Sequence, residues 1–143
     1  MQHTIIKNAN IINEGIQIQG DLLISNDRIE KIGGSIDIKA RANEIDGTGL
    51  HVLPGVIDDQ VHFREPGLTH KANIYTEAKA AVAGGTTSFM EMPNTSPAAL
   101  TVELLEQKYS RAAESSLANY SFFMGTSNDN YEEVMKTDFT KIG

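Results

Sequence analysis

The sequence predicts an α/β fold: about three strand–helix units that open a (β/α)8 TIM barrel, preceded by part of a small β-sandwich. Two observations lead to this prediction. Residues 1–51 contain only short, Ile-rich segments separated by turn residues, whereas from residue 52 apolar segments of strand length alternate with amphipathic helical segments. We therefore expect a β-sandwich segment over residues 1–51 and the first βα units of an incomplete barrel over residues 52–143.

The first 51 residues are expected to form short strands divided by turn signals. These signals are Asn13-Glu14-Gly15, Gly20, Ser25-Asn26-Asp27 and Gly33-Gly34. A sheet made from so few residues is thin and is expected to need support from the rest of the protein. The predicted strands are Thr4–Lys7, Ala9–Ile12, Ile16–Ile18, Asp21–Ser25 and Arg28–Ile32.

The second region alternates between the two kinds of element, and each predicted helix has a capping residue before an apolar stripe. Asn73 is the expected cap of the first helix, Gly84-Gly85 its end, and Thr101 the cap of the second helix. A short third helix is expected from Asp129 or Asn130 to Met135. The predicted strands are Val56–Phe63, Thr86–Met92 and Asn119–Met124, and the predicted apolar stripes are Ile74, Ala78, Ala81 and Val82 in the first helix and Leu105, Tyr109, Ala112 and Ala113 in the second.

Strands that alternate with helices pair in parallel through right-handed crossovers, so their polar ends meet at one edge of the sheet. A doubly wound sheet obeys the same rule. However, no Gly-rich phosphate loop follows any of the predicted strands, and Gly84-Gly85 comes after a helix. A complete barrel takes about 250 residues, so we expect the 143-residue chain to be the N-terminal portion of a larger protein.

Composition restricts the class of partner. The formal net charge of −7 argues against general binding to nucleic acid or to anionic membranes. The absence of cysteine excludes disulfides and thiolate metal sites. No apolar run approaches the length of a membrane span and no signal peptide is evident, so we expect a cytoplasmic protein.

The segment Pro54–Gly67 is the strongest candidate for a functional site. Along a strand, alternate side chains share a face, which groups Asp58, Gln60, His62 and Arg64. Burying an imidazole, a guanidinium and two further polar groups together in a core is costly. Such a group at the end of an apolar strand is therefore more simply explained as a site.

The pattern P-G-x-x-D-x-x-V-H-x-R-E-P-G over Pro54–Gly67 resembles the amidohydrolase superfamily, and within it the longer, bacterial class of dihydroorotase. Met92-Pro93-Asn94-Thr95, at the end of the next predicted strand, matches a second motif of that family. The glycines of Ala83–Thr87 and the leading β-rich segment also fit. The resemblance covers essentially the whole chain.

The resemblance implies a zinc-dependent hydrolase of cyclic amides that interconverts dihydroorotate and N-carbamoyl-L-aspartate in pyrimidine (UMP) biosynthesis. One or two zinc ions would activate the attacking water. His62 matches a zinc ligand and would also adjoin the substrate, while Arg64 and Asn94 match the groups that bind the substrate carboxylate. No catalytic residue is expected within this chain, because the other family ligands and the proton-shuttling aspartate would lie beyond Gly143. The fragment is therefore expected to be inactive alone.

One position departs from the family pattern. Gln60 stands where the family has its first motif histidine, and an amide oxygen is a weaker zinc ligand than an imidazole. We expect weaker binding of metal, a single metal, or a changed role. Two alternatives stay open: a non-catalytic subunit that supports aspartate transcarbamoylase, and an allantoinase or dihydropyrimidinase. The expected partners are the small substrate, the remainder of the barrel and a second copy in a homodimer.

Overall fold

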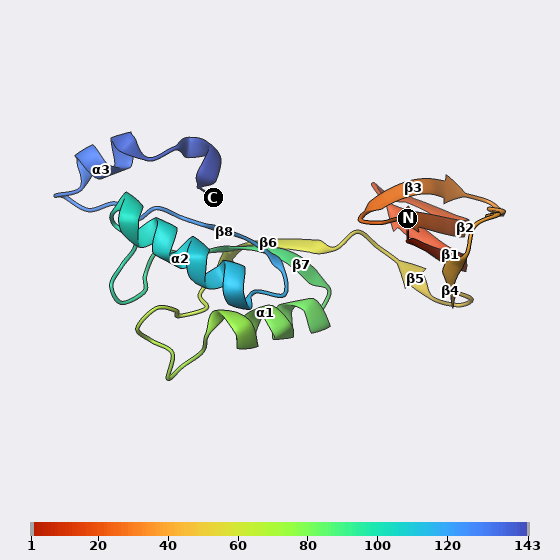
Figure 1. Ribbon diagram of the computed structural model, residues 1–143, viewed down its shortest axis with the longest axis horizontal. Helices are drawn as coiled ribbons and strands as arrows, with labels where there is room; N and C mark the ends of the chain where they lie inside the picture. Colours follow the sequence, from red (N-terminus) through yellow and green to blue (C-terminus); the bar gives the residue numbers. More distant parts are fainter. Residues whose placement is uncertain (1, 143) are drawn as a thin grey trace. The chain divides into compact units, whose positions relative to one another are not determined.

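The computed structural model describes residues 2–142, which form two compact units, one ending at Pro54 and the other beginning at Gly55 (Figure 1). The first unit contains only strands. The second alternates strands with helices. The chain therefore has the mixed α/β character that the sequence predicts.

The first unit is a mixed five-stranded sheet. Its central strands run antiparallel in the order β3-β2-β1, and β4 and β5 both pair in parallel with the remaining edge of β1. The described residues of this unit form this one sheet, so the second layer of the expected sandwich stays a prediction. The strands are β1 (His3–Asn13), β2 (Ile16–Ser25), β3 (Arg28–Gly33), β4 (Ala42–Asp46) and β5 (His51–Val52).

Two expected breaks are absent from these strands. Asn8 does not end a strand: β1 runs through it with a register shift between Ile6 and Ala9, and Asn8 takes a φ of 59° within this bulge. Gly20 likewise lies inside β2, where a Cβ atom would come within 2.5 Å of the Gly33 carbonyl oxygen. This glycine permits close approach of two strands, so reading it as a turn signal was wrong.

Asp21 is the buried polar centre of the first unit, with 2% of its surface exposed. Its Oδ2 accepts hydrogen bonds from Lys7 Nζ at 2.7 Å and from the Ile36 backbone N–H at 2.8 Å. Its Oδ1 accepts the N–H of Asn8, in the bulge, at 3.0 Å. The bond from Lys7 and then the bond from Ile36 lower the pKa of the Asp21 carboxyl to about 2.

The second unit is built on a three-stranded parallel sheet in the order β6-β7-β8, which confirms the predicted parallel pairing. No helix in residues 2–142 is long and apolar enough to cross a membrane. The strands are β6 (Val56–Val61), β7 (Thr86–Glu91) and β8 (Asn119–Phe122); the helices are α1 (Ile74–Ala83), α2 (Val102–Ser115), α3 (Tyr131–Lys136) and the 3-10 helix Phe139–Lys141.

The predicted caps of the two longer helices are confirmed. Asn73 accepts the Thr76 N–H and forms a capping box, and Thr101 accepts the Leu104 N–H. Asn130 precedes α3 but makes no capping bond with its side chain. Instead its Nδ2 donates to the carbonyls of Leu100 and Gly125, so this buried amide joins the loops that follow β7 and β8.

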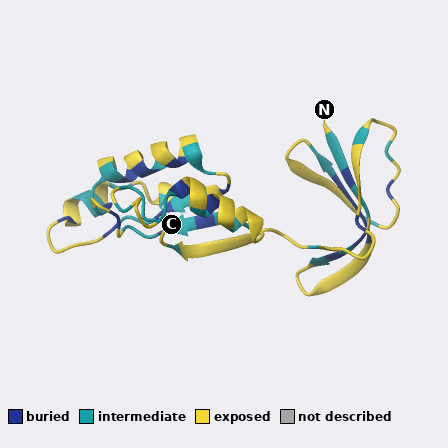
Figure 2. Cartoon of the chain, turned by 90° about the horizontal axis from the view of Figure 1, so that it is seen from below, coloured by how far each residue is buried: buried dark blue, intermediate teal, exposed yellow. Residues whose placement is uncertain are grey.

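The core of this unit lies between the helices and one face of the sheet (Figure 2). Val82 and Ala113, expected on the apolar stripes, are exposed, and the buried face of α2 includes Lys108 instead. Strand β6 is exposed along most of its length, with Val56 at 55% and Ile57 at 65%. The buried members of the core are Phe63, Ile74, Ala78, Phe89, Leu105, Ala112, Ala118 and Phe122.

We predict that Asp21→Asn destabilises the first unit by roughly 1–3 kcal/mol at pH 7, because the amide nitrogen cannot accept the bonds that the carboxylate oxygen accepts. The folded pKa is about 2, below the value of about 3.9 for an unfolded chain. The wild-type advantage is therefore present above about pH 4 and is lost as the pH falls toward 2. Denaturant unfolding of both proteins from pH 7 to pH 2 measures it.

Asp27→Asn is the matched control, because Asp27 and its partner Arg28 are 85% and 87% exposed and their closest atoms lie 4.0 Å apart. This change should leave the unfolding midpoint unaltered. Equal destabilisation by the two substitutions would contradict the role given to Asp21.

Candidate functional site

The carboxyl ends of the three parallel strands surround an open cleft of about 670 Å³. Residues from the ends of β6, β7 and β8 and from the loops that follow them contribute to its walls. This is the edge of the sheet where the sequence predicted that polar residues would meet. The lining residues are Asp59, Gln60, Met92, Pro93, Asn94, Ala98, Leu100, Phe123, Met124, Gly125 and Thr126.

The end of β6 is irregular. Its register with β7 shifts between Asp58 and Val61, and both Asp59 and Gln60 line the cleft. Asp58 turns back on the chain, where its Oδ1 accepts the Gln60 N–H at 3.2 Å. The expected single face holding Asp58, Gln60, His62 and Arg64 is therefore wrong, because the strand ends at Val61 and the alternation stops there.

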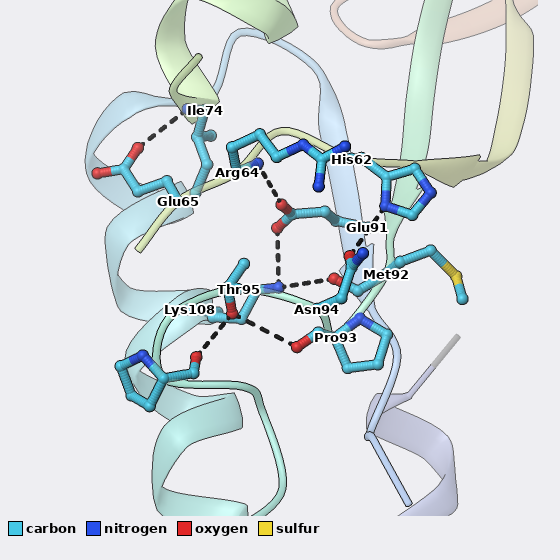
Figure 3. Close-up of polar contacts among 11 residues, drawn as sticks. His62, Arg64, Glu65, Ile74, Glu91, Met92, Pro93, Asn94, Thr95 and Lys108 are labelled. Carbon is cyan, nitrogen blue, oxygen red and sulfur yellow. Dashed lines mark hydrogen bonds and ion pairs between the residues drawn. The ribbon is translucent and has the colours of Figure 1, made fainter. Parts of the chain in front are cut away.

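His62 and Asn94 come together, although they are separated by 32 residues in sequence (Figure 3). Nδ1 of His62 lies 2.9 Å from Oδ1 of Asn94. The amide oxygen can only accept, so this bond places the ring proton on Nδ1. In the neutral ring, Nε2 then carries a free lone pair, which is the form in which imidazole binds a metal. The Asn94 amide nitrogen is a donor and takes no part in this bond.

Arg64 lies just beyond the strand in a backbone conformation that is rare for a residue with a side chain, at φ 71°. Its N–H donates to Oε1 of Glu91 at 3.0 Å. The side chain is half-buried and extends toward His62 in Figure 3. Glu91 thus fixes the point from which the guanidinium leaves the backbone.

Glu91 and Lys108 form a buried ion pair that the sequence analysis missed. Glu91 ends β7 and Lys108 lies on α2; Oε2 and Nζ are 2.9 Å apart, and each side chain is 1% exposed. Nζ also donates to the Met92 carbonyl at 3.1 Å and lies 4.9 Å from the centre of the Phe122 ring. The signal in the sequence was Lys108 between Leu105 and Ala112, on the stripe expected to be apolar.

Burial is the largest influence on both partners. It raises the pKa of Glu91, against the attraction of Lys108 and the backbone hydrogen bonds. It lowers the pKa of Lys108, against the attraction of Glu91. Since each charge is expensive to bury alone, the two groups depend on one another.

The loops after β6 and β7 also touch directly. The Ser96 N–H donates to the Pro66 carbonyl at 3.0 Å. A Cβ atom on Gly67 would overlap the Ser96 carbonyl oxygen, and Gly67 takes a φ of 82°. Glu65 ties the same loop to the start of α1 by accepting the Ile74 N–H at 2.9 Å. Glycine at position 67 is thus required both by the backbone angle and by the contact.

The donor set for a metal is partial. His62 offers Nε2, and Gln60 offers an amide oxygen at the cleft wall. Within residues 2–142, no three His, Cys, Asp or Glu side chains gather closely enough to hold a metal ion. A catalytic zinc site takes about three protein ligands. These residues fit part of such a site and do not fit a whole one.

Of the residues selected from the sequence, Gln60 and Asn94 line the cleft. His62 is hydrogen-bonded to Asn94. Arg64, two residues after His62, is held by the hydrogen bond from its backbone N–H to Glu91. His62 and Arg64 themselves are not among the lining residues. The structure therefore brings His62 to Asn94 and leaves the guanidinium beside them.

The family model and the curated relatives agree on one family. Residues 49–142 match the family model described as dihydro-orotase-like. The dihydroorotase of Streptococcus thermophilus is 40% identical over 137 residues, which cover 94% of this chain and 32% of that protein. The dihydroorotase of Ligilactobacillus salivarius is 42% identical over 113 residues, covering 78% of this chain and 26% of that protein. The chain thus spans about a third of the length of such relatives.

Solved structures of similar architecture include hydantoinases. The L-hydantoinase (dihydropyrimidinase) of Arthrobacter aurescens superposes with a TM-score of 0.87 at 26% identity, over 95% of this chain and 30% of that one. The D-hydantoinase (dihydropyrimidinase) of a Thermus species gives a TM-score of 0.76 at 30% identity, over 93% and 30% of the two chains.

We predict that Gly67→Ala destabilises the second unit more than Gly85→Ala. Both glycines have positive φ values, 82° and 90°, so alanine is strained at either position by roughly 1 kcal/mol. Only at Gly67 would the new methyl group also strike the Ser96 backbone, whereas nothing lies within 4 Å of a Cβ on Gly85. Thermal unfolding of the two variants measures the difference, and equal melting temperatures would refute the contact.

Proposed function

This chain belongs to the dihydro-orotase-like family, and we propose from this that it is the opening part of a cyclic amide hydrolase acting on dihydroorotate. The reaction is the interconversion of dihydroorotate and N-carbamoyl-L-aspartate in pyrimidine biosynthesis. The observation that carries the proposal is the hydrogen bond between His62 and Asn94. It joins a potential metal ligand to a potential carboxylate donor at the carboxyl edge of a parallel sheet.

The proposed architecture is a (β/α)8 barrel whose first three βα units are those of residues 56–142, with the leading sheet as part of a β-sandwich. A parallel sheet is normally covered on both faces. Here the helices cover one face, and β6, at the edge of the sheet, leaves both Val56 and Ile57 exposed. The remainder of a barrel would close this sheet, in keeping with relatives about three times as long as this chain.

Zinc is the proposed cofactor, as one or two ions. A bound zinc ion would supply an activated water for attack on the ring carbonyl. The residues of this chain that would hold it are His62, through Nε2, and Gln60, through its amide oxygen. Asn94 orients the His62 ring by accepting the Nδ1–H, as the partners of metal-binding histidines do. The other ligands and the catalytic groups are proposed to lie on further strands.

The proposed ligand of Arg64 is the carboxylate of the substrate. A guanidinium is planar and can bind both carboxylate oxygens. The Asn94 amide nitrogen, left free by the bond of its oxygen to His62, would donate to the same substrate. A neutral ring would not require the arginine, which favours dihydroorotate over hydantoins and dihydrouracil. The protein is further proposed to act in the cytoplasm as a homodimer, with aspartate transcarbamoylase as a possible partner.

We predict that the full-length protein prefers dihydroorotate to allantoin and to dihydrouracil, measured as kcat/KM. Arg64→Met should lower kcat/KM for dihydroorotate by roughly 10- to 150-fold, the equivalent of 1.5–3 kcal/mol for hydrogen bonds to a charged group. The control is Arg28→Met, at an exposed arginine of the first unit, which should leave kcat/KM unchanged. Residues 1–143 alone should show no turnover.

Preference for a neutral ring would replace this proposal by a dihydropyrimidinase (hydantoinase) or an allantoinase function; similar solved structures bear the first of these names. Zinc-dependent turnover by residues 1–143 would contradict the inactivity of the fragment.

We also predict that the full-length protein binds zinc more weakly than its Gln60→His variant, because imidazole is a better zinc ligand than an amide. His62→Ala should lose roughly 10- to 100-fold or more in zinc affinity. Mutating a residue that only hydrogen-bonds to a metal ligand already costs that much, and the loss of a ligand itself should cost at least as much. Zinc content after dialysis against graded chelator concentrations measures both effects, with His70→Ala as the control at an exposed histidine.

Absence of zinc from the full-length protein, together with unchanged activity of Gln60→Ala and His62→Ala, would instead favour a non-catalytic subunit that supports aspartate transcarbamoylase.

A further inference from the structure

We propose that the Glu91–Lys108 ion pair positions the carboxylate-binding groups of the site by holding the loops that carry Arg64 and Asn94 at a fixed separation. This inference rests on the proposed function, because it gives Arg64 and Asn94 the role of binding a substrate carboxylate. Neither member of the pair lines the cleft. Both are therefore positioning residues and not catalytic ones.

The ion pair is connected to both loops by direct hydrogen bonds (Figure 3). Oε1 of Glu91 accepts the Arg64 N–H at 3.0 Å, in the loop after β6. Nζ of Lys108 donates to the Met92 carbonyl at 3.1 Å, two residues before Asn94 in the loop after β7. The two side chains are 2.9 Å apart, so one chain of contacts runs from the first loop through Glu91 and Lys108 to the second.

The Arg64 backbone needs such a restraint. A non-glycine residue at φ 71° is strained, and strain of this kind persists only where the surroundings fix the conformation. The restraint itself is rigid, because both side chains are 1% exposed and the ammonium group also lies over the Phe122 ring. Water does not compete for these bonds, so the Arg64 backbone, from which the guanidinium side chain extends, stays in one position.

Stability alone is a poor explanation of this pair. Removing two charges from water is expensive, and buried ion pairs are often replaced by apolar residues of similar size without loss of stability. Two methionines at these positions would fill the space and would not hold the Arg64 N–H or the Met92 carbonyl. Beyond packing, the charged pair supplies an acceptor for the Arg64 N–H and a donor to the Met92 carbonyl, and these two hydrogen bonds are directional.

The experiment compares two double variants of the full-length protein, Glu91→Met/Lys108→Met and Glu91→Gln/Lys108→Met. Both remove the ion pair and the bond to the Met92 carbonyl. Only the glutamine variant keeps an acceptor for the Arg64 N–H, so the difference between the two variants isolates that bond. Dissociation constants for dihydroorotate, with KM and kcat, are measured in each.

We expect Glu91→Met/Lys108→Met to raise the KM and the dissociation constant for dihydroorotate on the order of 10- to 100-fold, as misplaced binding groups do. The glutamine variant should lose less, on the order of 3- to 10-fold, because it retains the acceptor for the Arg64 N–H and lacks only the restraint on the Asn94 loop. In an Arg64→Ala background, the methionine pair should cause a smaller further loss, since only its effect on the Asn94 loop remains. Wild-type binding by the methionine variant, or an equal loss in the Arg64→Ala background, would overturn the proposal.

A second measurement needs neither activity nor a variant. The Arg64 amide lies in a loop, yet its bond to a buried carboxylate should slow its hydrogen exchange by at least about 100-fold relative to an unprotected amide. The exposed Thr69 in the same loop is the comparison. Fast exchange at Arg64 would refute the restraint even if the methionine variant failed to fold. If the wild type does not bind dihydroorotate, the proposed function fails, and this measurement still decides whether Glu91 holds the loop.

Discussion

The ion pair between Glu91 and Lys108 is buried where water cannot screen it, and both loops of the candidate site are bonded to it. Its two charges come from β7 and α2, so it also joins the sheet to the helix that covers it. Desolvation works against each charge, and their mutual attraction opposes that penalty only while the geometry is kept. The core of the unit and the shape of the site therefore depend on the same contact.

Parallel pairing determines where that contact can act. Because β6, β7 and β8 run in the same direction, the loops that follow them all leave at one edge. His62 follows β6 and Asn94 follows β7, which is why side chains 32 residues apart are in hydrogen-bond contact. Asn130 adds the third loop by bonding the Leu100 and Gly125 carbonyls. The cleft is thus a consequence of strand direction, refined by buried polar side chains.

Local signals predicted the second unit well and the first unit less well. Asn73 and Thr101 cap helices because capping depends on neighbouring residues alone, which a sequence displays directly. Gly20 was misread because its reason lies in another strand, at the Gly33 carbonyl. Lys108 was missed for the same reason. The charge on the apolar stripe of α2 is explained by its ion pair with Glu91, and only the folded chain brings these two residues together. Contacts between residues that are distant in sequence could not be predicted from the sequence pattern alone.

Asn94 links the two halves of the proposed site through a single amide group. Its oxygen accepts the His62 Nδ1–H, which leaves Nε2 available to a metal and the amide nitrogen available to a carboxylate. Any rotation of the Asn94 side chain that improved one of these contacts would disturb the other. Metal binding and carboxylate binding in the proposed site are therefore energetically coupled, and the coupling must be reciprocal. As a ligand of the proposed metal, the Gln60 amide would make the site more dependent on His62, and hence on the orientation that Asn94 gives it.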